Sequence, residues 1–238
     1  AYDKLQKGYE LLQTGNAAQA LLLAEEAIAI EPREAHFYNL AAKALARNED
    51  YARALSMLEK ALKRNDAYFD YYLQRGLIEQ KRGNTALAQQ DFMQSTRLLP
   101  TAQAHHGLGM IAMANGDTNK AIKHFQVGAS NQSPAGLKSF SMLTRLDLPQ
   151  NPQRYIRLEG KRNQKGYLTL TATNRSPLPI WSVSVQISIH HPDGRPSPKY
   201  NVTFPQQIEP NKTGVTPTHI GPFSSDAQLA NTVRLVLI

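Results

Sequence analysis

The order of hydrophobic and polar residues changes along the chain. Through the first 147 residues, apolar side chains recur every three or four positions, the spacing of the buried face of an α-helix. After residue 155, apolar and polar residues alternate, as Leu168, Leu170 and Ala172 do, which is the spacing of a half-buried strand. The pattern predicts a helical region over residues 1–148 and a β domain over residues 149–238.

The distribution of proline supports this division. Only Pro32 and Pro100 fall within the first 133 residues, whereas eleven of the fourteen prolines lie between Pro149 and Pro222. Proline removes a backbone donor and pushes the preceding residue out of the helical conformation. The segment 148–152 holds two of these prolines and is expected to be the joint through which no helix runs.

The helical region repeats with a period near 34 residues. Small residues are expected where two antiparallel helices cross closely, and larger residues such as Leu58, Phe92 and Phe125 are expected to fill the adjacent space. The recurring small positions are Gly8, Ala20 and Ala27, then Ala42, Ala54 and Ala61, then Gly76, Ala88 and Ser95, then Gly109, Ala121 and Gly128.

A turn with a common pattern separates the two predicted helices of each unit, at residues 14–17, 48–51, 82–85 and 115–118. Glycine in three of these turns permits the left-handed conformation that ends a helix. The Asn or Asp that follows is expected to cap the second helix, and these residues are Asn16, Asp50, Asn84 and Asp117.

These recurring positions resemble the tetratricopeptide repeat (TPR) family over about residues 1–135. The resemblance implies an α-solenoid of four helix-turn-helix repeats, whose last hydrophobic face needs a cover. Residues 134–146 are expected to form that capping helix, with Ser133 as its N-cap and Pro134 at its first position. Its apolar face is expected to hold Leu137, Phe140, Met142 and Leu143.

The remainder of the chain is expected to be a small antiparallel β-sandwich, with strands near 155–158, 167–174, 180–189 and 233–238. In the third of these, alternation predicts one face made of Trp181, Val183, Val185, Ile187 and Ile189. A turn is predicted at residues 192–194. The run from 170 to 185 resembles the immunoglobulin-like bacterial envelope modules of the FxLYD type.

TPR solenoids usually bind a peptide or protein segment on the concave wall made by their first helices, in the manner of helix and extended-peptide grooves. The resemblance therefore implies a binding groove rather than a catalytic centre. By register, its residues are Tyr2, Leu5, Tyr9, Leu12, His36, Asn39, Lys43, Arg47, Leu73, Leu77, His106, Met110 and Met113, with Asp70, Gln80 and Gln103 at further first-helix positions.

Some TPR proteins clamp the terminal carboxylate of chaperone tails with Lys, Asn and Arg at fixed positions. The corresponding residues here are Leu5, Tyr9, Leu40, Asp70 and Gln74, so this clamp is absent. A ligand of that class is therefore not expected, and the groove's partner remains an unspecified peptide or protein.

Catalytic and metal chemistry find little support in the sequence. The chain has no cysteine, no HExxH motif and no glycine-rich phosphate loop. The histidine pairs at 105–106 and 190–191 are adjacent in sequence, so their rings diverge, and a structural role is favoured for both. The expectation is a chain without enzyme activity, resident metal or cofactor.

Charge is uneven between the two regions. Residues 1–148 carry 17 Lys and Arg against 15 Asp and Glu, while residues 149–238 carry 10 against 4. A basic tail is compatible with nucleic-acid or anionic-membrane contact, but dispersed charges favour an ordinary soluble surface. No apolar run reaches the length of a membrane span, and no pattern sets the oligomeric state.

A narrower resemblance lies in the segments 24–35, 71–76 and 100–109, which are similar to the C-terminal TPR region of bacterial periplasmic zinc metalloproteases of the BepA-like, HExxH class. It implies a substrate-binding or regulatory role beside a catalytic domain that precedes Ala1, and a periplasmic or envelope location. Zinc would then belong to that domain, because none of its ligands is in this chain. The alternative location is the cytoplasm.

Overall fold

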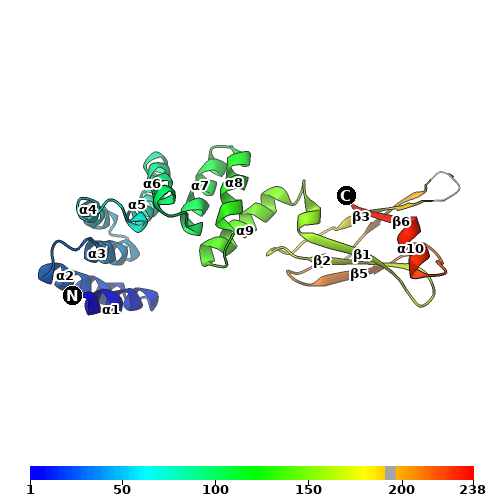
Figure 1. Cartoon of the computed structure of the whole chain (residues 1–238), viewed down its shortest axis with the longest axis horizontal. Coiled ribbons are helices and arrows are strands. Elements are labelled where there is room, and N and C mark those ends of the chain that lie inside the picture. Colours follow the sequence, from blue (N-terminus) through cyan, green and yellow to red (C-terminus); the bar gives the residue numbers. More distant parts are fainter. Residues whose placement is uncertain (191–196) are drawn as a thin grey trace. The chain divides into compact units, whose positions relative to one another are not determined.

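The computed structural model describes residues 1–190 and 197–238, and Figure 1 shows how their elements are arranged. The chain divides into two compact units, residues 1–136 and 137–238. The first holds paired helices and the second holds the strands, so the predicted change from α to β structure is confirmed. The turn predicted at 192–194 and His191 lie outside the described residues.

Within residues 1–136, helices form four antiparallel pairs that stack in chain order (Figure 1). Each second helix contacts the first helix of the next pair, and each first helix also contacts the next first helix. The pairs are α1 (Tyr2–Gln13) with α2 (Ala17–Ile30), α3 (Ala35–Arg47) with α4 (Tyr51–Leu62), α5 (Phe69–Lys81) with α6 (Thr85–Leu98), and α7 (Ala102–Ala114) with α8 (Thr118–Gly128).

Close helix crossings explain the small residues of the repeat. A Cβ added at Gly76 would lie 2.8 Å from the ring of Phe92, and one at Gly109 would lie 2.5 Å from the ring of Phe125. Both rings are fully buried, as is Leu58 at the equivalent position of the second repeat. The predicted division between small crossing positions and large filling positions is therefore confirmed.

The turns within the pairs share a left-handed residue. Its φ is +84° at Gly15, +61° at Glu49, +82° at Gly83 and +77° at Gly116. The predicted caps are only half correct, because the side chains of Asp50 and Asp117 accept from backbone N–H groups but those of Asn16 and Asn84 do not. Asn16 donates to Gln19 and Asn84 donates to Glu79, so each amide is turned toward a neighbouring side chain.

Helix α9 (Pro134–Asp147) begins in the first unit and continues into the second. The predicted N-cap is confirmed, since Ser133 Oγ accepts a hydrogen bond from the N–H of Gly136 at 3.1 Å. The helix ends before the proline-rich joint, as expected. Leu137 is 52% exposed, which corrects its assignment to a buried face, while Phe140, Met142 and Leu143 are half-buried. A capping role for α9 stays a prediction.

The second unit contains two three-stranded antiparallel sheets, in the orders β1-β2-β5 and β4-β3-β6. Buried residues of both sheets, such as Leu170 and Ile187, share one core, which confirms the predicted sandwich. The elements are η1 (Pro152–Arg154), β1 (Ile156–Arg162), β2 (Leu168–Asn174), β3 (Ser184–Ile189), β4 (Lys199–Thr203), β5 (Thr213–Pro217), α10 (Asp226–Thr232) and β6 (Val233–Leu237). Helix α10 was not expected.

One strand differs from the prediction. Pairing in β3 begins only at Ser184, because Ser182 has a left-handed backbone with φ +54°. This conformation interrupts the alternation, so Ile180 is buried and Trp181 is 69% exposed. The prediction that Trp181 shares the buried face of Val185 and Ile187 is therefore wrong.

Candidate functional site

A hollow of about 450 Å³ lies on the wall formed by the first helices of the repeats. All four first helices contribute to it, so residues almost a hundred positions apart in sequence line one space. We call it the inner hollow, and its lining residues are Tyr9, Leu12, Gln13, Lys43, Ala46, Arg47, Gln74, Leu77 and Gln103.

The inner hollow brings together five residues of the predicted groove, namely Tyr9, Leu12, Lys43, Arg47 and Leu77. Gln103, a further first-helix position, lines it too. Gln13, Ala46 and Gln74 also line the inner hollow but were not among the predicted groove residues. A helical turn separates Gln13 from Tyr9 and Gln74 from Asp70, and this spacing is the signal that would have found them.

Three predicted groove residues are placed elsewhere by burial or aromatic packing. Asn39 and Leu73 are buried, with 0% and 4% of their surface exposed. His36 lies in an aromatic cluster, where its Nδ1 is 3.0 Å from the Tyr71 hydroxyl and its ring packs edge-on against Tyr68. All three side chains therefore pack against other residues of the solenoid and do not line the inner hollow.

The other predicted residues also lie outside the inner hollow. Tyr2 donates to Glu34 at 2.7 Å, His106 packs against Phe125, and Leu5, Met110 and Met113 are half-buried. None of the five is among the residues that line the inner hollow.

Asp70 is bonded to two residues that line the inner hollow, Lys43 and Gln74. The residue is 8% exposed, and its carboxylate accepts from Lys43 Nζ at 2.7 Å, Asn39 Nδ2 at 2.7 Å and Gln74 Nε2 at 2.9 Å. A buried carboxylate is stable when such donors replace the water it has lost. The network joins α3 to α5 and holds the Lys43 ammonium in place. Gln74 uses its amide nitrogen for the bond to Asp70, so its side-chain oxygen takes no part in the network.

Tyr9 forms one side of the same space. The Lys43 Nζ lies 5.2 Å from the centre of the Tyr9 ring, within the range of a cation–π contact. Burial, followed by the negative charge of Asp70, raises the pKa of the Tyr9 hydroxyl above its usual value, so the side chain stays neutral. Tyr9 therefore offers an uncharged surface beside a cation that is already paired.

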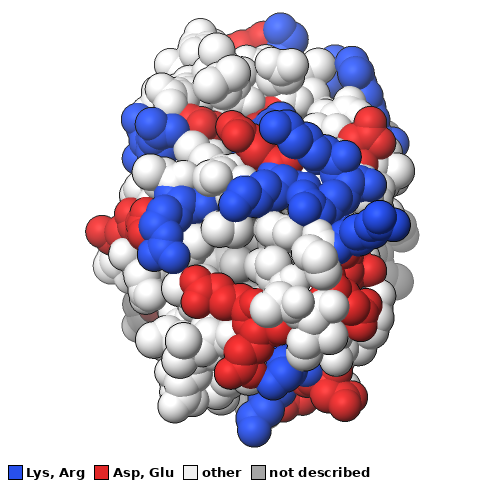
Figure 2. Space-filling view, turned by 90° about the vertical axis from the view of Figure 1, so that its left-hand side faces the viewer, with Lys and Arg blue, Asp and Glu red and all other residues white. Residues whose placement is uncertain are grey.

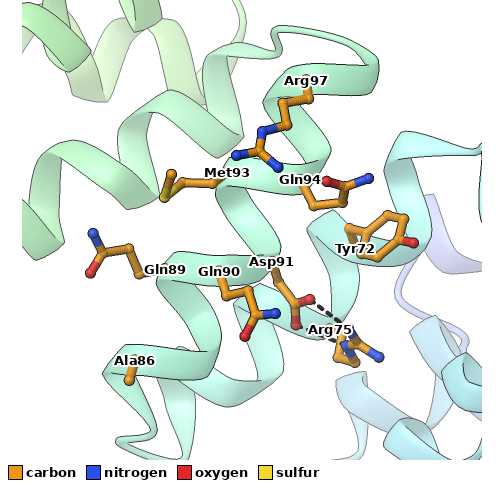
Figure 3. Close-up of a pocket in the computed structure, with 9 residues that line it drawn as sticks. All are labelled: Tyr72, Arg75, Ala86, Gln89, Gln90, Asp91, Met93, Gln94 and Arg97. Carbon is orange, nitrogen blue, oxygen red and sulfur yellow. Dashed lines mark hydrogen bonds and ion pairs between the residues drawn. The ribbon is translucent and has the colours of Figure 1, made fainter.

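A second hollow, of about 430 Å³, opens on the α5–α6 pair and is drawn in Figure 3. We call it the outer hollow, because second-helix residues supply most of it. Arg75 forms a two-pronged ion pair with Asp91, at 2.9 and 2.7 Å, whereas no interaction is drawn for Arg97 (Figure 3). The lining residues are Tyr72, Arg75, Ala86, Gln89, Gln90, Asp91, Met93, Gln94 and Arg97.

A neighbouring space of about 630 Å³ shares Gln89, Met93 and Arg97 with the outer hollow and extends to α7 and α8. His124 lines it, and the Nδ1 atoms of His124 and His105 are 3.2 Å apart. Burial lowers the pKa of both histidines, and the charge of His124 lowers that of His105 further. No short spacing in the sequence indicates this pair, because its members lie on different helices.

The described residues form neither a metal site nor a membrane-spanning helix. Across the ranges 1–190 and 197–238, no group of three or more His, Asp or Glu side chains is placed to hold a metal ion. No helix in that part of the chain combines the length and hydropathy needed to cross a bilayer.

Figure 2 shows a band of positive charge on one end of the molecule, although Lys and Arg also lie beside acidic residues elsewhere in this view. Lys and Arg gather there into a band, with Asp and Glu above and below it. Positive surface is therefore not confined to the basic tail.

Several solved structures resemble the chain. They include PilF of Pseudomonas aeruginosa (18% identity, TM-score 0.56, covering 64% of this chain and 71% of that one). The Cut9 and Hcn1 hetero-tetramer of the APC/C also matches (20%, 0.55, 63% and 30%), as does TTC0263, a thermophilic TPR protein in Thermus thermophilus (21%, 0.53, 61% and 80%). At such low identity these likenesses show the fold.

Comparison of the sequence with curated proteins finds no match. A family model described as "Tetratricopeptide repeat" matches residues 5–68, 39–88 and 73–134, which together span more than half of the chain. The matched stretches coincide with the paired helices α1 to α8. The chain belongs to the tetratricopeptide repeat family.

Proposed function

We propose that this chain is a non-catalytic interaction module that binds a peptide or protein segment in the inner hollow. The observation that carries the proposal is the lining of that hollow, to which all four first helices contribute. Its mixture of apolar, amide and charged side chains suits a polypeptide, which offers the same groups. No catalytic step is assigned to the chain.

Site-specific photo-crosslinking tests the proposal in cells. A benzophenone amino acid placed at Gln103 of the inner hollow is expected to capture a partner protein, and the same group at Ala86 of the outer hollow is the control. Both positions line hollows of similar volume, so accessibility alone does not favour one. Equal capture at the two positions, or capture only at Ala86, contradicts the proposal.

A narrower version places the chain in the bacterial envelope, as the accessory region of a zinc metalloprotease that presents substrates to a catalytic domain. Its support is the resemblance of segments 24–35, 71–76 and 100–109 to that class of protein. Sequencing of the gene upstream of the codon for Ala1 tests it. An HExxH domain there supports the accessory role, and an unrelated upstream region contradicts it.

A further inference from the structure

We propose that the inner hollow selects an extended acidic segment and that Arg47 binds its side-chain carboxylate. The inference rests on the proposed function and names the chemistry of its ligand. It depends on the charges and hydrogen-bonding groups that line the hollow.

Among the described residues, the inner hollow has one uncompensated charge. Lys43 is neutralised by its 2.7 Å ion pair with Asp70, and no Asp or Glu is among the lining residues. Arg47 is exposed and, within the described part of the chain, takes part in none of the ion pairs found. A guanidinium in this state suits a carboxylate, which it binds through two parallel hydrogen bonds. A basic segment would instead meet an unpaired positive charge.

Three glutamines define the shape of the ligand. Gln13, Gln74 and Gln103 enter the hollow from α1, α5 and α7, so amide groups are spread along its length. Each amide both donates and accepts hydrogen bonds. An extended backbone has free N–H and C=O groups to pair with them, whereas a helix has already used its own. Leu77, which is only half-buried, adds an apolar contact beside these amides.

Nucleic acid would also supply anions, but the lining does not favour it. Single-stranded nucleic acids bind where several cations accompany exposed aromatic rings that stack with bases. Of the residues that the structure describes, the inner hollow offers one free cation, and its single aromatic ring, Tyr9, is already in contact with Lys43. An acidic polypeptide therefore fits the hollow better.

Matched peptides test the inference with the full 238-residue chain. Ten-residue extended peptides, blocked at both termini, are arrayed in three versions that carry Glu, Gln or Lys at the same polar positions. Binding is then measured by fluorescence anisotropy. The Glu version is expected to bind about tenfold more tightly than the Gln version, because one charge-assisted contact is added. Blocked termini exclude a terminal carboxylate as the source of the effect.

Three variants at two arginines test whether the preference depends on the inner hollow. Arg47→Ala is expected to remove the tenfold preference, and Arg47→Glu is expected to transfer it to the Lys peptides. Arg97→Ala removes the same charge from the outer hollow and is expected to leave the preference unchanged. Equal loss with Arg47→Ala and Arg97→Ala overturns the inference, since the effect is then one of net charge.

The remaining outcomes separate this inference from the proposed function. Equal binding of Glu and Gln peptides that is blocked by Ala46→Phe, which fills the hollow, overturns acidic selection but supports a groove. Tighter binding of a poly-dT oligonucleotide than of any peptide, lost in Arg47→Ala, overturns the ligand class. No binding of any peptide, or binding that Ala46→Phe does not change, contradicts both proposals.

Discussion

The inner and outer hollows are built from nearly the same parts. Within the described residues, each holds three glutamines, one cation paired with a buried carboxylate and one arginine outside the ion pairs found. Their difference lies in where the parts come from. Two helices of one repeat supply the outer hollow, whereas four helices of four repeats supply the inner one.

A second difference concerns the carboxylates. Asp91 lines the outer hollow itself, while Asp70 is not among the residues that line the inner hollow. Similar composition therefore leaves a carboxylate on the lining of the outer hollow and none on the lining of the inner hollow. The inner hollow and the outer hollow therefore differ in which helices supply their residues more than in the types of residue.

The largest expected effect concerns Asp91, which is 3% exposed and pairs with Arg75. Asp91→Ala leaves the Arg75 guanidinium without its partner and is expected to lower the free energy of unfolding by about 3 kcal/mol. Urea denaturation measures this as a lower midpoint with an unchanged slope. Asp66→Ala, at an exposed loop position, is the control and should leave the midpoint unchanged. If Asp91→Ala also leaves the urea midpoint unchanged, the Arg75–Asp91 pair does not stabilise the fold.

Asp70 is expected to give two opposite effects. Asp70→Asn keeps the shape of the side chain but weakens its three hydrogen bonds, which should cost about 2 kcal/mol of stability. The same change frees the charge of Lys43, so affinity for the Glu peptides is expected to rise about threefold. Asp91→Asn frees Arg75 in the outer hollow and should leave that affinity unchanged. A fall in affinity with Asp70→Asn would contradict the assignment of Lys43 to the ligand surface.

Acidification is expected to weaken the fold without weakening the ligand site. The pKa values of His105 and His124 are lowered in the folded chain, so the unfolded chain binds more protons below its ordinary histidine pKa of about 6.5. Stability is therefore full above that pH and falls as the pH decreases, by at most about 1.4 kcal/mol per pH unit for each proton gained.

Thermal unfolding measured between about pH 7.5 and pH 5 checks this sign, since ordinary carboxylates titrate below that range. His124→Gln should flatten the dependence. No histidine of the described residues lines the inner hollow, so peptide affinity is expected to stay constant between about pH 7.5 and 6. Stability that rises on acidification would contradict the prediction.

The smallest expected effect comes from the core side of α6. Ser95 is fully buried, and its hydroxyl has no hydrogen-bond partner among the described residues. Ala27 and Ala61 occupy the same position in the first two repeats. Ser95→Ala should raise the free energy of unfolding by about 1 kcal/mol, as a higher urea midpoint, and leave peptide binding unchanged. A lower midpoint would show that the hydroxyl is satisfied in solution.

The sequence predicted those features that depend on local spacing. Gly76 and Gly109 marked helix crossings because each repeat solves the same packing problem with the same residue sizes. Leu170 and Ala172 marked a buried strand face because their alternation continues without interruption. The prediction for Trp181 was wrong because Ser182 has a left-handed backbone that interrupts the alternation. A serine at that position does not by itself predict this conformation.

The candidate site was predictable only in part. Lys43 and Arg47 follow from helical register, which is set within one repeat. The pairing of Lys43 with Asp70 joins two repeats and depends on how one first helix packs on the next. Packing between repeats therefore decides that Lys43 is paired and Arg47 is not. No short sequence spacing predicts that packing.

The span of the inner hollow has a mechanical consequence. In a linear array, each repeat is held by its neighbours alone, so the end repeats open first and the array loses order stepwise. A ligand that contacts α1 and α7 at once would couple the first repeat to the fourth. The end repeats would then unfold together rather than separately. Occupancy would then be visible as slower hydrogen exchange in terminal helices that the ligand itself barely covers.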